Sequence, residues 1–188
     1  MARARSPEKR SAILEAAVHE IAEAGLGAPT AKIAKRAGVA EGTLFTYFAN
    51  KEDLLNQLYL ELKGEAYERI NASFPPKTSL RQRTWHVWSS YLEWAIEYPE
   101  KRKASVQLNV SDVVTAETRA RTARVRGMID ATIEELEARG PLKGLPVGFA
   151  AAMMSAMQEA TMNFMLKHPK QKKELMERAF EVYWHALR

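Results

Sequence analysis

The chain has 188 residues, of which 46% are hydrophobic and 27% charged, a globular composition with enough apolar side chains to bury a core. It contains no cysteine, which excludes disulfides, thiol catalysis and cysteine-ligated zinc. No apolar run is long enough to span a bilayer, and the basic N-terminus lacks the apolar stretch of a signal peptide, so we expect a cytoplasmic protein with no membrane partner. The net charge of +5 permits nucleic-acid binding without requiring it, and the basic bias is densest in residues 1–51.

The first fifty residues predict three helices. Ser6-Pro7-Glu8 supplies a hydroxyl for the N-cap, a proline for the first helical position and an acid that the helix dipole favours. Apolar residues then recur at helical spacing until Gly25. A second helix is expected over residues 30–37, ended by Gly38 in the left-handed conformation, and a third over residues 41–48.

The remaining chain also predicts helices. Asn50 caps a fourth helix, which continues towards Ile70 until the prolines of residues 71–79 break it. Further helices are expected over residues 79–98, 100–109, 115–139, 147–167 and 170–187. No alternating strand pattern occurs, so the predicted fold class is all-α.

The stretch "AGVAEGTLFTYF" over residues 37–48 joins the second and third helices by a tight turn, which is helix-turn-helix geometry. Leu44 and Phe48 are four residues apart and share the face that would anchor the third helix. Hydroxyls and a glycine occupy the other faces, where they suit phosphates and base edges. Composition alone leaves two interpretations open, a helix of core and ordinary surface or a helix that reads DNA.

The longer stretch "PTAKIAKRAGVAEGTLFTYFANKEDLL", residues 29–55, resembles the DNA-binding signature of the tetracycline-repressor (TetR) family. The resemblance implies an N-terminal helix-turn-helix DNA-binding domain over residues 1–51 and a C-terminal helical effector-binding and dimerisation domain over residues 52–188. Shorter segments are similar to a multidrug-responsive, RamR-like subgroup of that family. The function implied is that of a ligand-responsive repressor, a homodimer on a near-palindromic operator of double-stranded DNA, released by a small hydrophobic or amphipathic effector.

The DNA contacts implied by the resemblance fall into two groups. Phosphate contacts are assigned to Thr30, Phe45, Tyr47 and Lys51, and base-edge or groove contacts to Glu41, Gly42, Thr43 and Thr46. Lys32 adds phosphate neutralisation, unless it belongs to a solvated helix face. The chain departs from the family pattern at Pro29 and Ala40, where hydroxyl caps are missing, and at Phe45, which lacks the usual hydroxyl. Arg3 and Arg5 form either a minor-groove arm or a disordered tail.

The C-terminal half contains a series of aromatic residues and a helix rich in methionine. Ordinary core packing is one interpretation, and the other is an effector pocket, because a largely apolar cavity with a few polar groups is what a small-molecule site requires. The residues expected to line such a pocket are Tyr59, Lys63, Trp85, Trp88, Tyr91, Met154, Met157 and Gln158.

The last two helices have more apolar surface than a single chain needs, which predicts a four-helix dimer interface. The residues expected in that interface are Phe149, Met153, Ala156, Ala160, Phe164, Phe180, Tyr183 and Trp184. The alternative is a last helix that folds back on its own subunit.

Two other functions are alternatives to the repressor, an enzyme and a binding module without DNA recognition. The chain has no nucleotide-binding or hydrolase motif, its four histidines are scattered, and no Glu-x-x-His pair occurs, so we expect no enzyme, no metal and no cofactor. A helical binding module that has lost DNA binding is the second alternative, which the missing caps support and the intact Gly42-Thr43, Tyr47 and Lys51 oppose.

Overall fold

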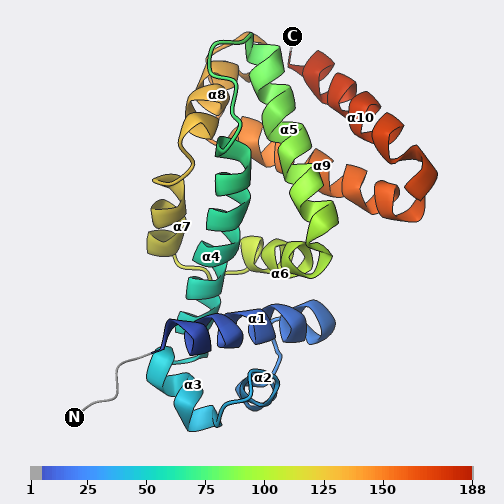
Figure 1. Cartoon of the computed structure of the whole chain (residues 1–188). Helices are drawn as coiled ribbons and strands as arrows, with labels where there is room; N and C mark the ends of the chain where they lie inside the picture. The colour runs from blue at the N-terminus through green and yellow to red at the C-terminus, as the bar shows by residue number, and fades with distance from the viewer. Residues whose placement is uncertain (1–5, 188) are drawn as a thin grey trace. The chain divides into compact units, whose positions relative to one another are not determined.

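A computed structural model describes residues 6–187, and over that range every regular element is helical, which confirms the all-α prediction (Figure 1). The α-helices are α1 Pro7–Ala24, α2 Thr30–Arg36, α3 Glu41–Tyr47, α4 Lys51–Asn71, α5 Leu80–Glu97, α6 Pro99–Asn109, α7 Ala116–Ala123, α8 Met128–Glu137, α9 Phe149–Lys167 and α10 Lys172–Ala186. Two 3-10 turns, η1 Gly140–Leu142 and η2 Pro169–Gln171, precede α9 and α10. Arg3 and Arg5 lie outside the described residues.

The helices form two compact units. The first unit contains the described residues up to Glu65 together with Tyr98–Ala123, and the second contains Ala66–Glu97 and the described residues from Arg124 onward. Helix α6 packs on α1 within the first unit, and the functional boundary after residue 51 stays a prediction. Gln107 on α6 donates a hydrogen bond to the Ile21 carbonyl at 3.1 Å. Helix α4 runs without a break from the first unit into the second.

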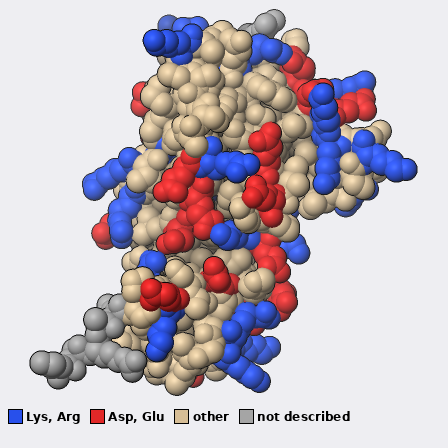
Figure 2. Space-filling model, in the orientation of Figure 1, with Lys and Arg blue, Asp and Glu red and all other residues tan. Residues whose placement is uncertain are grey.

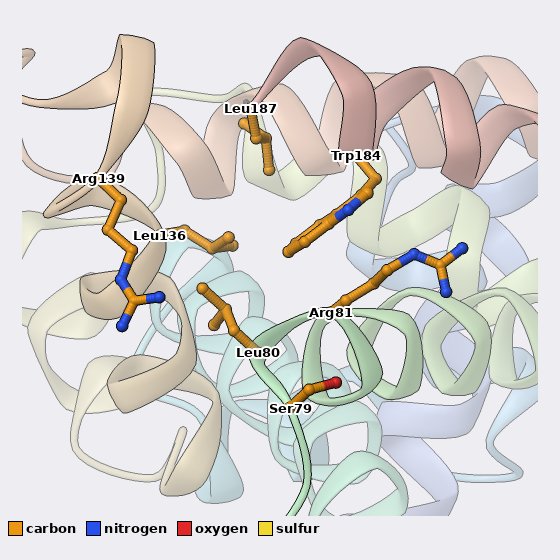
Figure 3. A pocket seen from close by; sticks show the side chains of 7 residues that line it. All are labelled: Ser79, Leu80, Arg81, Leu136, Arg139, Trp184 and Leu187. Atoms are coloured by element: carbon orange, nitrogen blue, oxygen red, sulfur yellow. The ribbon is translucent and has the colours of Figure 1, made fainter.

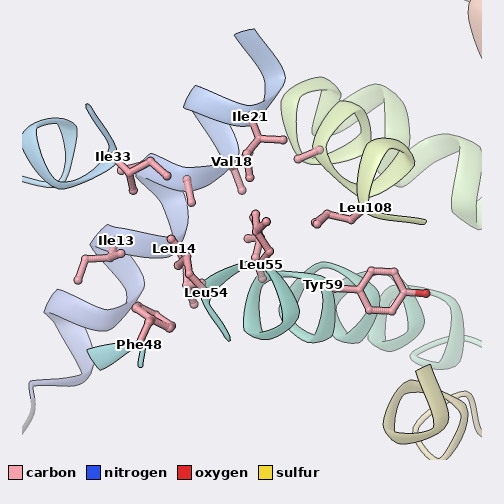
Figure 4. Close-up of a cluster of buried hydrophobic side chains, with 14 of the residues drawn as sticks. Ile13, Leu14, Val18, Ile21, Ile33, Phe48, Leu54, Leu55, Tyr59 and Leu108 are labelled. Carbon is pink, nitrogen blue, oxygen red and sulfur yellow. The ribbon is translucent and has the colours of Figure 1, made fainter. Parts of the chain in front are cut away.

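The core of the first unit forms where α1, α4 and α6 place their apolar faces together (Figure 4). Leu14, Val18 and Ile21 of α1 are buried there as their spacing predicted, and each such burial contributes about 1.5–3 kcal/mol. Ser6 caps α1 as expected, since its hydroxyl accepts a hydrogen bond from the Lys9 amide at 3.2 Å.

The turn between α2 and α3 has the conformation that the glycine predicted. Gly38 has φ +68°, and the Val39 amide donates to the Ala34 carbonyl at 3.0 Å, which closes the end of α2 in a Schellman motif. Neither Pro29 nor Ala40 offers a capping side chain to the helix that follows it, so the missing hydroxyl caps are confirmed.

The prediction of one helix over residues 115–139 is wrong, because the chain leaves α7 at Ala123 and starts α8 at Met128. Gly127 has φ +61°, which a right-handed helix does not contain. The side-chain amide of Asn71 donates to the Arg126 carbonyl at 3.1 Å, so that carbonyl bonds a distant side chain. A β-carbon at Gly127 would lie 3.2 Å from Asn71 Oδ1, and glycine therefore serves both the backbone angle and the close approach.

The second unit packs α5, α8, α9 and α10 around Trp88, which is fully buried and stacks on Tyr183 with ring centroids 5.8 Å apart. The start of α9 has no hydroxyl cap, and the Glu137 carboxylate accepts hydrogen bonds from the Gly148 and Ala150 amides at 2.8 and 3.1 Å. The Tyr183 hydroxyl donates to the Ala150 carbonyl at 3.2 Å. Burial, with a smaller contribution from Glu137, raises the pKa of Tyr183 well above its ordinary value. No helix in the described part of the chain is both long and apolar enough to cross a membrane.

Candidate nucleic-acid interface and effector site

Helix α3 is anchored in the first unit mainly through one face. Leu44 and Phe48 are 0% and 1% exposed, and the Arg10 guanidinium lies 5.9 Å from the Phe48 ring centroid. The rest of the helix faces outward, with Glu41, Gly42, Phe45 and Thr46 exposed and Thr43 and Tyr47 half-buried. The fold therefore contains the two buried anchors and the outward face that the spacing predicted.

The outward face of α3 presents backbone as well as hydroxyls. A β-carbon added at Gly42 would meet nothing within 4 Å, so the backbone is open at that position. The Thr46 hydroxyl donates to the Gly42 carbonyl at 3.2 Å. Its oxygen lone pairs remain for a donor, and its methyl group suits a thymine methyl.

Tyr47 has a partner that its sequence neighbourhood does not reveal. The Ser6 amide, 41 residues earlier, donates to the Tyr47 hydroxyl at 3.0 Å. The phenolic oxygen acts as the acceptor in this bond, and its own hydrogen is left for an acceptor such as a phosphate. The start of α1 thus positions the hydroxyl at the end of α3.

Two residues with separate predicted DNA contacts pair with each other. The Thr30 hydroxyl at the start of α2 donates to the Glu41 carboxylate at the start of α3, at 2.6 Å. While this bond lasts, the Thr30 hydrogen does not reach a phosphate, although its oxygen can still accept. Nothing in the local sequence indicates this pairing, because each residue alone fits the family pattern.

Basic side chains gather over α2 on the face shown in Figure 2. Lys32 and Lys35 are exposed, whereas Arg36 contacts Glu20 at 2.7 Å and Glu23 at 3.4 Å. The hydrogen bond that Arg36 donates to Glu20, with further charge contributions from Glu20 and Glu23, raises the pKa of Arg36. Lys51, at the first position of α4, is half-buried. The two lysines of α2 therefore supply positive charge that no acidic side chain of their own helix offsets.

The first unit has the helix-turn-helix geometry of a DNA-binding regulator. The model of the family described as "Bacterial regulatory proteins, tetR family" matches residues 13–58, from α1 into α4. The crystal structure of a TetR family transcription regulator from Shewanella sp. PV-4 is 31% identical, with a TM-score of 0.83 over 97% of this chain and 98% of that one. The chain belongs to the TetR family of transcriptional regulators, which bind DNA and small-molecule ligands, as the resemblance predicted. The narrower RamR-like resemblance stays a prediction.

Two further relatives have names connected with fatty acids. The fatty acid metabolism regulator protein of Bacillus subtilis is 42% identical over 80 residues, which are 42% of this chain and 41% of that protein. The crystal structure of the regulator FadR from Bacillus subtilis, in complex with stearoyl-CoA, has a TM-score of 0.68 and 27% identity, covering 92% of this chain and 96% of that one.

The residues predicted to bind an effector lie in both units. Tyr59 and Lys63 belong to the first, and Trp85, Trp88, Tyr91, Met154, Met157 and Gln158 belong to the second. Tyr59 is 5% exposed, and its ring has Lys63 Nζ at 5.5 Å and the Arg119 guanidinium at 5.6 Å from its centroid. Its hydroxyl donates to Asn109 Oδ1 at 3.3 Å. Arg119 and Asn109 are neighbours that the sequence reasoning missed.

In the second unit, three of the predicted residues meet in the core. Gln158 is 5% exposed, and its amide donates to the Trp88 carbonyl at 3.2 Å. The Trp88 indole donates to the Met176 carbonyl at 3.1 Å, and Met154 is buried beside them. The polar groups of this cluster therefore have protein partners. Tyr91, half-buried, donates to Glu159 at 2.9 Å.

The predicted dimer residues divide according to exposure. On α9, Phe149 and Phe164 are 43% and 56% exposed, and the small residues Ala156 and Ala160 are exposed between them, with Met153 half-buried. On α10, Trp184 is half-buried, whereas Phe180 and Tyr183 are 1% and 0% exposed within their own unit. Val182 of α10, which was not predicted for the interface, is 63% exposed. The apolar surface available to a partner is therefore concentrated on α9.

Proposed function

We propose that the protein is a ligand-responsive transcriptional repressor that binds a near-palindromic operator as a homodimer and is released by a small hydrophobic or amphipathic effector. The observation that carries this proposal is the outward face of α3, where Gly42, Thr43, Thr46 and Tyr47 are accessible while two buried anchors fix the helix. A homodimer would place two copies of α3 in successive major grooves, about 34–36 Å apart.

In this proposal, residues 1–51 bind DNA, and residues 52–188 bind the effector and form the dimer contact. In the dimer we propose, the exposed line Phe149, Met153, Ala156, Ala160 and Phe164 forms the contact. Small residues in such a line let two helices approach closely. The protein acts in the cytoplasm, where the DNA is, and catalyses no reaction.

Candidate effector contacts are Tyr59 and Lys63 in the first unit and the Trp88–Gln158 cluster in the second. Helix α4 carries Tyr59 and Lys63 and is continuous with the chain that follows α3, so a ligand that prefers one position of α4 changes the position of α3. Operator affinity then falls by the ligand's differential affinity for the two conformers and by no more. The stearoyl-CoA bound to a related regulator supports an amphipathic acyl compound as the class of effector.

Selection of bound DNA fragments tests the proposal. Purified protein is mixed with sheared genomic DNA, and the retained fragments are sequenced and used in gel-shift titrations with and without stearoyl-CoA. We expect a shared inverted repeat and a lower affinity when effector is present. Binding without sequence preference would instead support a helical module that has lost specific DNA recognition, and monomeric protein in sedimentation experiments would contradict the dimer.

A further inference from the structure

A pocket of about 360 Å³ lies in the second unit where α5 begins and where α8 and α10 end. Its apolar lining comes from Leu80, Leu136, Trp184 and Leu187, with Arg81 and Arg139 on two sides (Figure 3). The volume falls in the range of about 300–1,000 Å³ that small-molecule sites occupy. None of these residues is among those assigned above to the effector site.

The charged groups at this pocket have a positive excess. Arg81 pairs with Glu181 and lies 5.6 Å from the Phe180 ring centroid, and Arg139 contacts Glu135 at 2.7 Å. Glu135 is shared, because Arg83 also binds it, and the hydrogen bond from Arg83 lowers the pKa of that carboxylate. The pocket lining itself holds two guanidinium groups, Arg81 and Arg139, and no carboxylate, and the Arg139 side chain is 64% exposed.

The positive charge at this pocket does not come from the backbone amides in the first turn of α5. The Ser79 amide donates to Gln82 Oε1 at 3.1 Å, and the Gln82 amide donates to the Ser79 hydroxyl at 3.3 Å. This reciprocal pair is a capping box, which satisfies the amides of Ser79 and Gln82. The attraction for an anion at this place comes from the arginine side chains.

Trp184 forms one wall of the pocket without being fixed by a hydrogen bond. Its buried indole nitrogen has no acceptor among the described residues, although buried indoles usually find one. The ring stacks on Phe180 with centroids 6.3 Å apart. The indole can therefore shift to admit a ligand without breaking a hydrogen bond.

We infer that this pocket binds a small amphipathic carboxylate, with an aliphatic or aromatic tail of roughly six to eight carbons, at a site separate from the effector site. The carboxylate pairs with Arg139, whose planar guanidinium group matches its two oxygens, and Arg81 adds positive charge on the other side of the pocket. The tail lies against Leu80, Leu136 and the Trp184 ring. Charge and apolar surface are both required, so neither a neutral nor a cationic chain of the same length is a good ligand.

Nuclear magnetic resonance of the indole groups tests the inference without DNA, so its outcome is independent of operator binding. The chain has four tryptophans, and the Trp184 indole resonance is identified from the spectrum of Trp184→Phe. Octanoate is titrated into labelled protein, with octan-1-ol and octyltrimethylammonium as chain-matched controls. We expect a saturable shift of the Trp184 resonance with octanoate alone.

Variants locate the binding site. Arg139→Gln, at an exposed position that should tolerate the change, is expected to weaken octanoate binding by about tenfold. Arg178→Gln removes a charge of the same helix as Trp184 at a position paired with Glu174, and should leave binding unchanged. Met154→Ala alters the effector cluster and should preserve the Trp184 shift. Absence of a saturable shift, equal binding of octan-1-ol, or loss of the shift in Met154→Ala would each overturn the inference.

Discussion

Helices α3 and α9 both expose side chains to a prospective partner, but they are held in different ways. Helix α3 is anchored by Leu44 and Phe48, and bonds from Thr30 to Glu41 and from Ser6 to Tyr47 join its two ends to the starts of α2 and α1. Helix α9 is bonded to α8 through Glu137 at its start and to α5 through Gln158 at its middle. The proposed surface for DNA thus depends on contacts with α1 and α2, whereas the proposed surface for a second subunit lies on a helix bonded to α5 and α8.

The largest expected effect comes from removing an anchor of α3. Leu44→Ala empties a fully buried site, so the free energy of unfolding should fall by about 2–5 kcal/mol. Phe45→Ala, on the neighbouring residue that is 42% exposed, should change it by no more than about 0.5 kcal/mol. Urea unfolding of both variants measures the difference, and equal effects would show that α3 is not held by one face.

The glycines on either side of this helix-turn-helix junction should respond in opposite directions. Gly38→Ala forces a left-handed conformation on a residue with a β-carbon and should destabilise the protein by about 1–2 kcal/mol. Gly42→Ala lies in helical backbone with open space around it and should stabilise by up to about 1 kcal/mol, while weakening operator binding. Thermal unfolding and gel-shift titration separate the two effects. Stabilisation by Gly38→Ala would refute the account of the turn.

A smaller effect on the free energy of unfolding, which depends on pH, is expected in the second unit. Burial raises the pKa of Tyr183 in the folded protein, so the unfolded chain loses this proton near pH 10 while the folded chain keeps it. The contribution of Tyr183 to the free energy of unfolding is therefore fully present well below pH 10. It decreases as the pH rises further, by about 1.4 kcal/mol at pH 11. Unfolding free energies at pH 9 and pH 11 should differ more in the wild type than in Tyr183→Phe. The same pH dependence in both would show that Tyr183 is accessible to base.

Short-range sequence patterns predicted much of the secondary structure and burial of the first unit. The cap at Ser6, the left-handed Gly38 and the buried pair on α3 each depend on residues within a few positions of one another. The break between α7 and α8 was not predictable, because Gly127 acquires its role from Asn71, more than fifty residues earlier.

Contacts between residues far apart in the sequence were likewise not predictable at the candidate sites. Outward residues of α3 follow from helical spacing, but the bonds from Ser6 to Tyr47 and from Thr30 to Glu41 join separate helices. In the second unit, the apolar surplus of α10 suggested an interface, whereas stacking with Trp88 buries Tyr183 inside its own unit. Amphipathic spacing shows that a face is apolar and does not tell which neighbour covers it.

The most direct test of the outward face of α3 compares Tyr47→Ala with Thr46→Ala on the selected operator and on a set of single-base variants. We predict that Tyr47→Ala weakens binding to every sequence alike, because it removes a phosphate contact. Thr46→Ala should change the preference at one or two base pairs by about 1–3 kcal/mol and leave the others unaffected. Wild-type affinity in both variants, with folding intact by circular dichroism, would contradict the assignment of this face to DNA.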